Sequence, residues 1–371
     1  MKKLLYTALA AITLFTSCSK KTELTPVNIK PIIYQNENVT IKVEPKLELL
    51  MIALRLAEVV PFSNNAYSQD YSQYVDGVDK LFEKQKDHPI VKELKSHCKN
   101  YKDGTSEILK ITRYISDDMT QLTIKPKELP EEMMVFWKGI NLKNFVEQFN
   151  DFAVKGNFAR IWVLYEAKLK NQAINVQDYY DFNKKVTDWI SDFYFSKDKT
   201  PVYEFHSTTI SGGDYILPSP IYKDDKTVLE IICPAYWNRE LNWNTIYSAM
   251  NLSAGYTYHT IRKHWDLFSA EGKRIVETIY TQNQITDKIT DQTIKSVVAT
   301  CLSVACLFNY EDIQNDEEIR TSLYNSLTTS YLIPNPDKLL SIIDYYNDNR
   351  DTYPDFESFV VNYLPEAIKE L

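Results

Sequence analysis

The chain has 371 residues, of which 44% are hydrophobic and 25% are charged, and its formal net charge is −8. This composition is that of a globular protein, and the length suffices for one large core or two modest ones. An acidic chain has no electrostatic attraction for nucleic acid, so we expect no nucleic-acid partner. The presence of only 8 glycines disfavours a turn-rich all-β fold and favours a largely helical one.

The amino terminus has the pattern of a lipoprotein signal peptide. Two lysines precede an apolar run over residues 4–15, and the small residues Thr16 and Ser17 lead to Cys18. The apolar run is too short to span a bilayer permanently, and its positive flank orients it for export. We therefore expect a signal peptide over residues 1–17, lipidation of Cys18, and contact with a bilayer through the acyl anchor.

The residues after the cysteine predict where the protein is held. Ser19, directly after the cysteine, is not a signal that retains a lipoprotein in the inner membrane. We therefore expect the protein in the cell envelope of a Gram-negative bacterium, anchored in the outer membrane. Whether it lies on the periplasmic or the surface face stays open. Residues 18–34 are polar, include two prolines, and predict a tether. No later segment offers eighteen consecutive apolar residues, so we expect a soluble body beyond the tether.

Four further cysteines, at positions 98, 233, 301 and 306, show no CxxC spacing. A disulfide is permitted in the envelope but is not indicated by this pattern. Cys301 and Cys306 lie in the apolar run SVVATCLSVACLF, where a thiol behaves as a small hydrophobe. We expect buried free thiols, and any pairing among Cys98, Cys233, Cys301 and Cys306 stays open.

The first half of the mature chain, residues 35–200, is expected to be mostly helical. A short strand, VTIKV, precedes the helical pattern EPKLELLMIALRLAEVV, which ends at Pro61. Asp87-His88-Pro89 marks the start of one of several short helices. The periodicity then predicts helices over residues 71–82, 88–99 and 107–115, and two longer ones over residues 142–169 and 176–195.

The second half, residues 201–371, opens with the one clear β block. VYEFHSTT and TVLEIIC are rich in β-branched and aromatic residues, and the turn-rich segment ISGGDYILPSP separates them. A helix then begins at Asn242 or Asn244 and runs to Phe268. Helices follow from residue 287, with a break at PNPDK. The sequence thus predicts a predominantly helical α+β fold with a small sheet.

The stretch MNLSAGY, residues 250–256, occupies the place where a strand-then-helix arrangement would put a metal site. In HExxH zinc peptidases two histidines four residues apart bind one zinc ion, and a glutamate acts on the metal-bound water. Here Met250 and Ala254 stand at the histidine positions and Asn251 at the glutamate. A thioether is a poor zinc ligand, a methyl group is none, and a neutral amide is no general base.

The same helical face favours packing over metal binding. Its residues recur at spacings of three and four and are predominantly apolar, which predicts a stripe that packs into the core. On residue types alone, an ordinary buried helix is the simplest interpretation. The stripe consists of Ile246, Met250, Ala254, Thr257, Ile261, Trp265 and Phe268.

Four segments of the chain carry a family resemblance. They are VEPKLELLMIALRLAEV (43–59), KDHPIVKELK (86–95), LKNFVEQFNDFAVKGNFARIWVLYE (142–166) and NWNTIYSAMNLSAGY (242–256). In order and pattern the chain resembles the uncharacterised bacterial lipoprotein family called domain of unknown function 4932.

In that family the last segment carries an HExSH-like sequence, which implies a zincin-like metallopeptidase. Here Met250, Asn251 and Ala254 replace the histidine, glutamate and histidine. The resemblance therefore implies a zincin-like domain that has lost metal binding and catalysis, with no cofactor. It also implies a third ligand position on a later helix, where Asp291 or Gln292 lies.

The five histidines offer one alternative site. His259 and His264 are five residues apart and diverge around a helix, so they do not share a metal. A relocated site built from His206, His259 and a carboxylate stays open. His88, before a proline, more simply opens a helix. The chain has no GxSxG, P-loop or GxGxxG sequence, which excludes those hydrolase, NTPase and dinucleotide signatures.

We therefore expect an envelope lipoprotein with a degenerate, non-catalytic, metallopeptidase-like domain that binds a peptide or protein. An extended peptide pairs with an exposed strand through backbone groups, so such binding can remain after the metal site is lost. Two alternatives remain. One is an active zinc peptidase with relocated ligands, and the other is a glycan-binding lipoprotein of a nutrient-uptake system, suggested by the tether and 26 tyrosines.

Overall fold

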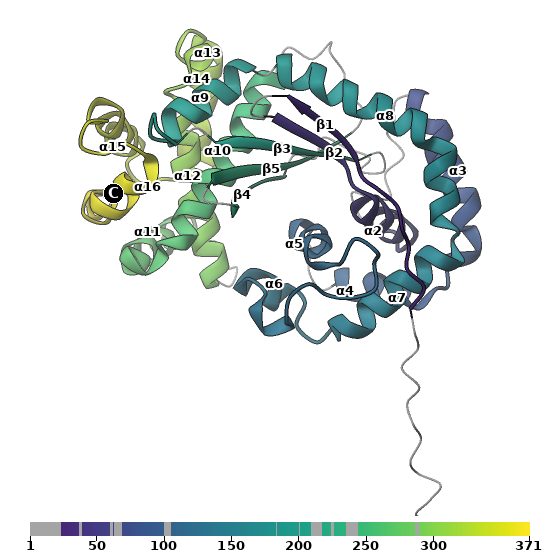
Figure 1. Cartoon of the computed structure of the whole chain (residues 1–371). Coiled ribbons are helices and arrows are strands. Elements are labelled where there is room, and N and C mark those ends of the chain that lie inside the picture. Colours follow the sequence, from purple (N-terminus) through teal and green to yellow (C-terminus); the bar gives the residue numbers. More distant parts are fainter. Residues whose placement is uncertain are drawn as a thin grey trace, which may run out of the picture.

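A computed structural model shows a predominantly helical α+β fold around one small sheet, as the sequence predicts (Figure 1). Cys18 and the rest of residues 1–23 lie outside the described part of the chain, so the lipidation site stays a prediction. The structure describes residues 24–36, 39–59, 62, 69–99, 105–182, 184–199, 201–208, 217–223, 226–234, 244–285 and 289–371.

The described strands form one mixed sheet in the order β1-β2-β3-β5-β4. β2 pairs in parallel with β3, and β3 with β5, whereas β1 and β4 pair antiparallel at the two edges. The sheet therefore joins strands from both sides of residue 200. Their bounds are Ile32–Asn36 (β1), Val39–Val43 (β2), Val202–Thr208 (β3), Leu217–Lys223 (β4) and Lys226–Pro234 (β5).

Helices surround this sheet. α8 runs along β1 and β2, while α10, α11, α12 and the C-terminal helices gather at the other end of the molecule (Figure 1). The bounds are Pro45–Leu56 (α2), Gln69–Phe82 (α3), Pro89–Cys98 (α4), Thr105–Lys110 (α5), Glu131–Phe136 (α6), Leu142–Lys155 (α7), Phe158–Phe182 (α8), Lys184–Tyr194 (α9), Asn244–Lys263 (α10), Ser269–Gln282 (α11), Asp291–Leu307 (α12), Glu311–Gln314 (α13), Glu317–Asn325 (α14), Pro336–Asp348 (α15), Phe356–Asn362 (α16) and Leu364–Ala367 (α17).

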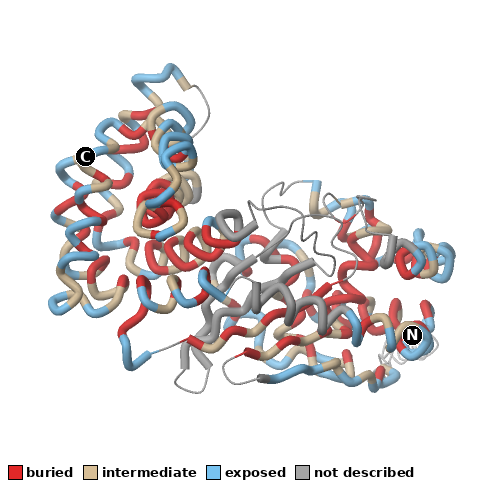
Figure 2. The backbone as a smooth tube through the Cα atoms, turned by 90° about the horizontal axis from the view of Figure 1, so that it is seen from above, coloured by how far each residue is buried: buried red, intermediate tan, exposed pale blue. Residues whose placement is uncertain are grey.

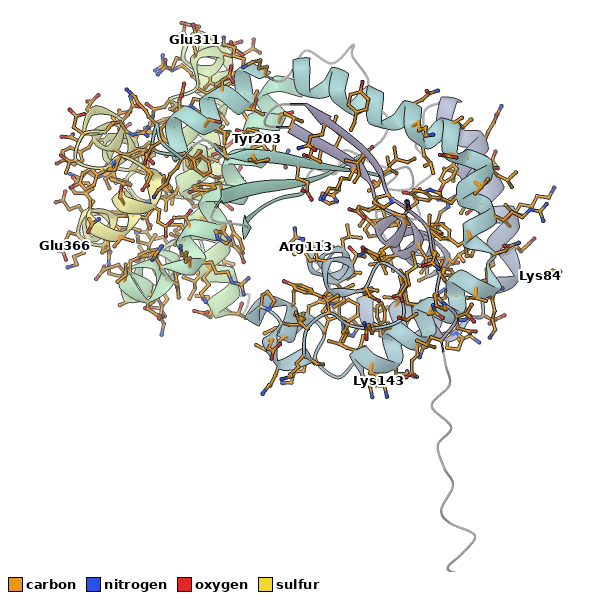
Figure 3. All side chains as sticks on the ribbon, in the orientation of Figure 1. Lys84, Arg113, Lys143, Tyr203, Glu311 and Glu366 are labelled. Carbon is orange, nitrogen blue, oxygen red and sulfur yellow. The ribbon has the colours of Figure 1, made fainter. Side chains whose placement is uncertain are left out.

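One face of the sheet belongs to the hydrophobic core. Alternate residues of β2 are buried, and Ile41 lies opposite the buried Phe205 of β3. This alternation follows from the pleat of a strand, which turns successive side chains to opposite faces. The hydroxyl of Tyr203 donates to the carbonyl oxygen of Thr187 at 2.7 Å and so ties β3 to α9 (Figure 3). Buried residues gather where helices face each other and the sheet (Figure 2).

Many aromatic residues serve packing. Tyr74, Tyr194, Tyr310 and Tyr346 are among the largest fully buried side chains of the described residues. These four tyrosines therefore belong to the packed core and not to an exposed binding surface. Buried tyrosines need a partner for the hydroxyl, and Tyr346 donates to the carbonyl oxygen of Phe193 at 2.5 Å.

Several helix bounds differ from the prediction. The helix expected over residues 142–169 is two helices, α7 and α8, because the chain turns at Gly156 and Asn157, where Asn157 has φ +52. A left-handed residue ends a helix, and asparagine tolerates that conformation better than most residues. α8 then continues to Phe182. It therefore covers residues 170–175, where a break was expected, and the first part of the helix expected over residues 176–195.

The sheet also holds two strands that the sequence assigned otherwise. LPSPIYK, partly within the segment expected to be turns, forms β4 as an edge strand, where prolines are tolerated. β1 begins at Ile32, so the expected tether over residues 18–34 overlaps the sheet by three residues. Each of these strands pairs antiparallel with the strand that directly follows it in the chain. The prediction was wrong at both places because neither IIYQN nor LPSPIYK has the regular apolar and polar alternation that marks a strand.

The described thiols carry no disulfide. Cys301 and Cys306 are buried and Cys98 is half-buried, all three as free thiols, while the side chain of Cys233 is not described. Burial raises the pKa of Cys301 and of Cys306 to about 12, so both stay protonated and unreactive. Among the described helices, none is both long enough and apolar enough to cross a membrane.

Candidate functional site

The candidate site lies on α10, the helix that carries residues 250–256. α10 packs on α9 and α12 and lies beside the edge strand β4. Ser253 of α10 donates to the carbonyl oxygen of Ser303 on α12 at 3.2 Å, and Trp265, just after α10, donates to Asp291 at 3.2 Å. These two contacts run in opposite order along the two helices, so α10 and α12 are antiparallel.

One arc of α10 is buried against these helices through polar groups as well as apolar ones. The hydroxyl of Tyr194 lies 2.6 Å from that of Ser253 and 3.0 Å from that of Thr257, and all three residues are buried. Because Ser253 donates its proton to Ser303, it accepts from Tyr194. Burial raises the pKa of Tyr194 well above its usual value, so the network stays neutral.

The three motif positions lie on the arc of α10 next to the buried one, and this arc is more open. Met250 is 37% exposed, and Asn251 and Ala254 are half-buried. The predicted packing stripe is therefore wrong at Met250 and holds only in part at Ala254, which is half-buried, whereas it is confirmed from Thr257 onward; the side chain of Ile246 is not described. The buried arc is rotated around the helix, toward Ala249, Leu252, Ser253, Tyr256, Thr257 and Thr260.

The side chains on the open arc do not fit a zinc ion. Met250 offers a thioether, Asn251 an amide, and Ala254 a methyl group, and none of these is a zinc ligand of the usual kind. Within the described residues, no group of three histidine, cysteine or carboxylate side chains is arranged to hold a metal. We derive no metal-dependent step from this arc.

The expected third ligand position lies elsewhere. Asp291 is the first residue of α12, where it accepts from Trp265 and forms an ion pair with Lys295 at 2.6 Å. Since α12 is antiparallel to α10, Asp291 is level with the far end of α10, at least two helical turns from Ala254. The structure therefore does not bring Asp291 to the motif, and the side chain of Gln292 is not described.

The sheet carries a polar cluster that the sequence analysis noted only in part. Glu204 accepts from Lys42 at 2.8 Å and lies 2.9 Å from the Nε2 atom of His206. The register places Lys42 directly opposite His206, and Glu204 shares their face because it is two residues away. Burial opposes ionisation, but the hydrogen bonds from His206 and Lys42 outweigh it and lower the pKa of Glu204 to about 2.

The other histidines make separate contacts. His264 lies 2.7 Å from Glu357 on α16. His88 precedes α4 as predicted, where its Nδ1 atom accepts from the backbone N–H of Ile90 at 3.3 Å and its Nε2 atom lies 2.9 Å from Asp151. His206 is held by Glu204. The structure therefore does not assemble the relocated metal site from described residues.

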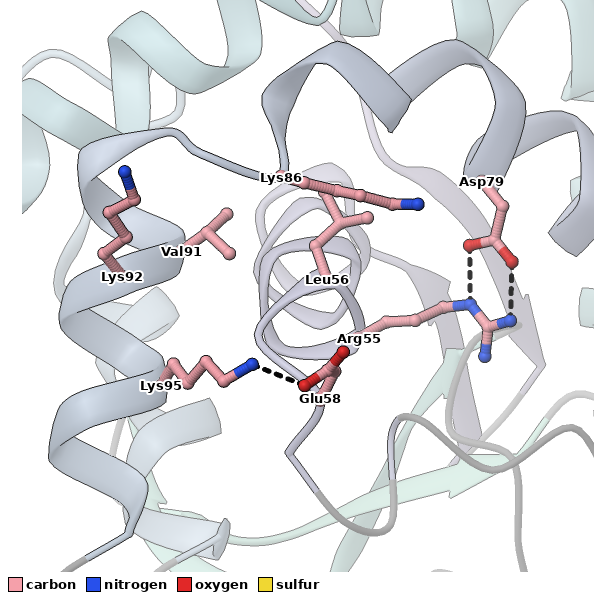
Figure 4. Close-up of a pocket in the computed structure, with 8 residues that line it drawn as sticks. All are labelled: Arg55, Leu56, Glu58, Asp79, Lys86, Val91, Lys92 and Lys95. Atoms are coloured by element: carbon pink, nitrogen blue, oxygen red, sulfur yellow. Dashed lines mark hydrogen bonds and ion pairs between the residues drawn. The ribbon is translucent and has the colours of Figure 1, made fainter.

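A charged hollow of about 380 Å³ lies at the C-terminal end of α2 (Figure 4). Arg55 donates to both carboxylate oxygens of Asp79, at 2.7 and 2.6 Å, and Lys95 pairs with Glu58. Basic side chains near a helix C-terminus complement its partial negative charge. Lys92 pairs with Asp87 at 3.0 Å, and Lys86 lies 4.0 Å from Glu83. Each cation that lines the hollow therefore has an acidic partner, so we assign the hollow a structural role.

A comparison of the chain with protein-family models, with curated proteins and with solved structures finds no match.

Proposed function

We propose that the chain is an outer-membrane lipoprotein, anchored through Cys18, whose zincin-like domain binds no zinc and instead binds a peptide or protein. The observation that supports this most directly is the open arc of α10. An ordinary core helix would bury Met250 and Ala254, whereas here Met250 is 37% exposed and Ala254 is half-buried, on a helix that contacts β4.

The edge strand β4 limits how a peptide would bind. Pro218 and Pro220 have no backbone N–H, and in the register they lie opposite Ile231 and Leu229 of β5. An edge strand tolerates a proline where the missing N–H would face away from the paired strand. In an antiparallel strand the N–H and C=O groups of one residue point to the same side, so the carbonyl oxygens of both prolines would face the free edge. A peptide lying along β4 would therefore donate its own N–H groups to these carbonyls.

Binding of short unstructured peptides, measured by fluorescence anisotropy, tests the proposal. We expect saturable binding that is lost when alternate peptide nitrogens are methylated, because those nitrogens would no longer donate. Ala254→Trp should block binding by filling the open arc, whereas Ala270→Trp, at an exposed position on α11, should not. Absence of saturable binding, or binding only to soluble glycans, would overturn the peptide proposal.

A further inference from the structure

An apolar surface lies at the opposite edge of the sheet from β4. Val163 and Leu164 on α8 are 70% and 60% exposed, and Ile33 and Tyr34 on β1 are 53% and 50% exposed. Single exposed apolar residues are ordinary on a protein surface. These four, however, lie on two elements that contact each other, and Val163 and Leu164 are the most exposed large apolar side chains of the described residues.

A groove of about 450 Å³ runs between α8 and the segment that leads into β1. Ile33 and Val163 both line it, so residues from the two elements share one surface. Ile29 and Trp162 also line it and are more buried, which gives the groove an apolar floor.

The rim of this surface is positively charged. Lys30 lines the groove and is exposed, and so is Arg160, which does not line the groove but lies three and four residues before Val163 and Leu164 on the same side of α8. Lys170 pairs with Glu166 at 2.8 Å, which leaves an excess of two positive charges among these four side chains. The whole chain has a net charge of −8, so this local excess runs against the average. An apolar surface with a basic rim suits a phospholipid surface, because acyl chains accept the apolar groups and phosphates pair with the cations.

The tether brings the same surface close to the anchor. Leu24 is six residues after Cys18, which allows a reach of about 20 Å. The chain is then fixed to the body, since Asn150 donates to the carbonyl oxygen of Thr25 at 2.8 Å and Val27 donates to that of Asp118 at 3.0 Å. The groove begins immediately after these contacts, at Asn28.

We propose that the surface formed by α8 and β1 lies against the bilayer, with Ile33, Val163 and Leu164 in the headgroup region and Lys30 and Arg160 at lipid phosphates. This inference rests on the lipid anchor of the proposed function and is independent of peptide binding. It assigns the molecule an orientation, with β1 toward the membrane and the opposite edge strand, β4, away from it.

Depth-dependent quenching tests this orientation. The acylated full chain is reconstituted in vesicles of phosphatidylethanolamine and phosphatidylglycerol, with an environment-sensitive fluorophore at Val163→Cys or, as control, at Leu267→Cys. Leu267 is 49% exposed and lies after α10. The same labelling reaction on the unsubstituted chain measures the background from native thiols, of which Cys98 is half-buried. We expect nitroxide-labelled lipids to quench the label at position 163 several-fold more than the label at position 267.

A second variant separates contact from chance exposure. Val163→Glu combined with Leu164→Glu changes two exposed positions and should reduce quenching of a label at Ile33→Cys to the control level. Equal quenching at positions 163 and 267 in chains that float with vesicles would overturn the orientation. So would a spectral shift at position 163 without quenching, which would indicate a second copy of the chain instead.

If the chain is not acylated and does not float, the anchoring proposal fails by itself. The label at position 163 is then measured on the unanchored chain with the same vesicles added. Quenching of that label would support the membrane-facing surface even without a lipid anchor. Absence of quenching would overturn both the anchor and the orientation.

Discussion

Ser253 donates a hydrogen bond to the backbone carbonyl oxygen of Ser303 at 3.2 Å, and this contact fixes which side of α10 faces the core. With Ser253 turned toward α12, the side chains of Met250 and Ala254 lie about 60° and about 100° around the helix from it, at the border of the buried side, and Asn251 lies about 160° away. The accessible arc is thus a consequence of how α10 packs.

The hydroxyl network behind α10 should contribute measurably to stability. Tyr194→Phe keeps the ring but removes the donor to Ser253 and the acceptor near Thr257, both buried. We expect the free energy of unfolding to fall by about 1–2 kcal/mol, because buried partners lose a hydrogen bond. Urea denaturation measures this. Tyr34→Phe, at a half-exposed tyrosine, should change it little, and equal effects of the two variants would contradict the role of the network.

Arg350 should stabilise the C-terminal end of α9. Its guanidinium donates to the carbonyl oxygens of Asp192, Phe193, Phe195 and Pro354 at 2.7 to 3.0 Å. Arg350→Ala would remove this donor from the carbonyls at and just after the end of α9 and from that of Pro354, and should lower the free energy of unfolding by roughly 2–4 kcal/mol.

Arg350→Lys separates charge from geometry in the same denaturation measurement. A lysine keeps the positive charge but not the planar fork, so we expect a loss of intermediate size. Arg160→Ala, at an exposed position on α8, serves as control and should have little effect. A full rescue by lysine would show that charge alone matters.

The cluster around Glu204 should make stability depend on pH in the acid range. The pKa of Glu204 is lowered to about 2 in the folded state, so the unfolded state binds the proton more readily. The stabilisation is therefore complete above the ordinary glutamate pKa and is lost as pH falls toward about 2. Its size is roughly 2 kcal/mol after allowance for partial exposure.

Glu204→Gln tests this linkage. The variant has no carboxyl group to titrate, so its free energy of unfolding should change less between about pH 5 and about pH 3 than that of the natural chain. Glu318→Gln, at an exposed glutamate on α14, is a matched control and should keep the natural pH dependence. The same slope in Glu204→Gln and the natural chain would refute the assignment.

Local signals predicted the fold well where they act within a few residues. His88 followed by Pro89 marked the start of α4, because the side chain caps the helix and proline suits its first position. α10 begins at Asn244, one of the two start positions expected from the sequence. By contrast, Gly156 and Asn157 lie inside a continuous apolar period, so the turn between α7 and α8 was not recognised.

Long-range pairing could not be predicted from the sequence. β2 and β3 are far apart in the chain and pair in parallel, and no local feature of either strand specifies that partner. The same limit applies to the site. Glu204 and His206 are two residues apart in a strand and so predictably share a face, but only the register brings Lys42 to them. The rotation of α10 depends on contacts with α9 and α12, which periodicity alone does not define.

Elemental analysis of purified mature protein tests most directly whether the α10 arc is a metal site emptied by substitution. The natural chain, without a His-tag, is dialysed against trace zinc beside a variant with Met250→His, Asn251→Glu and Ala254→His. Met250→His alone is the control, because one histidine cannot chelate. We predict no retained zinc in the natural chain or the control, and retained zinc in the triple variant. Near-stoichiometric zinc in the natural chain, or none in the triple variant, would contradict the account.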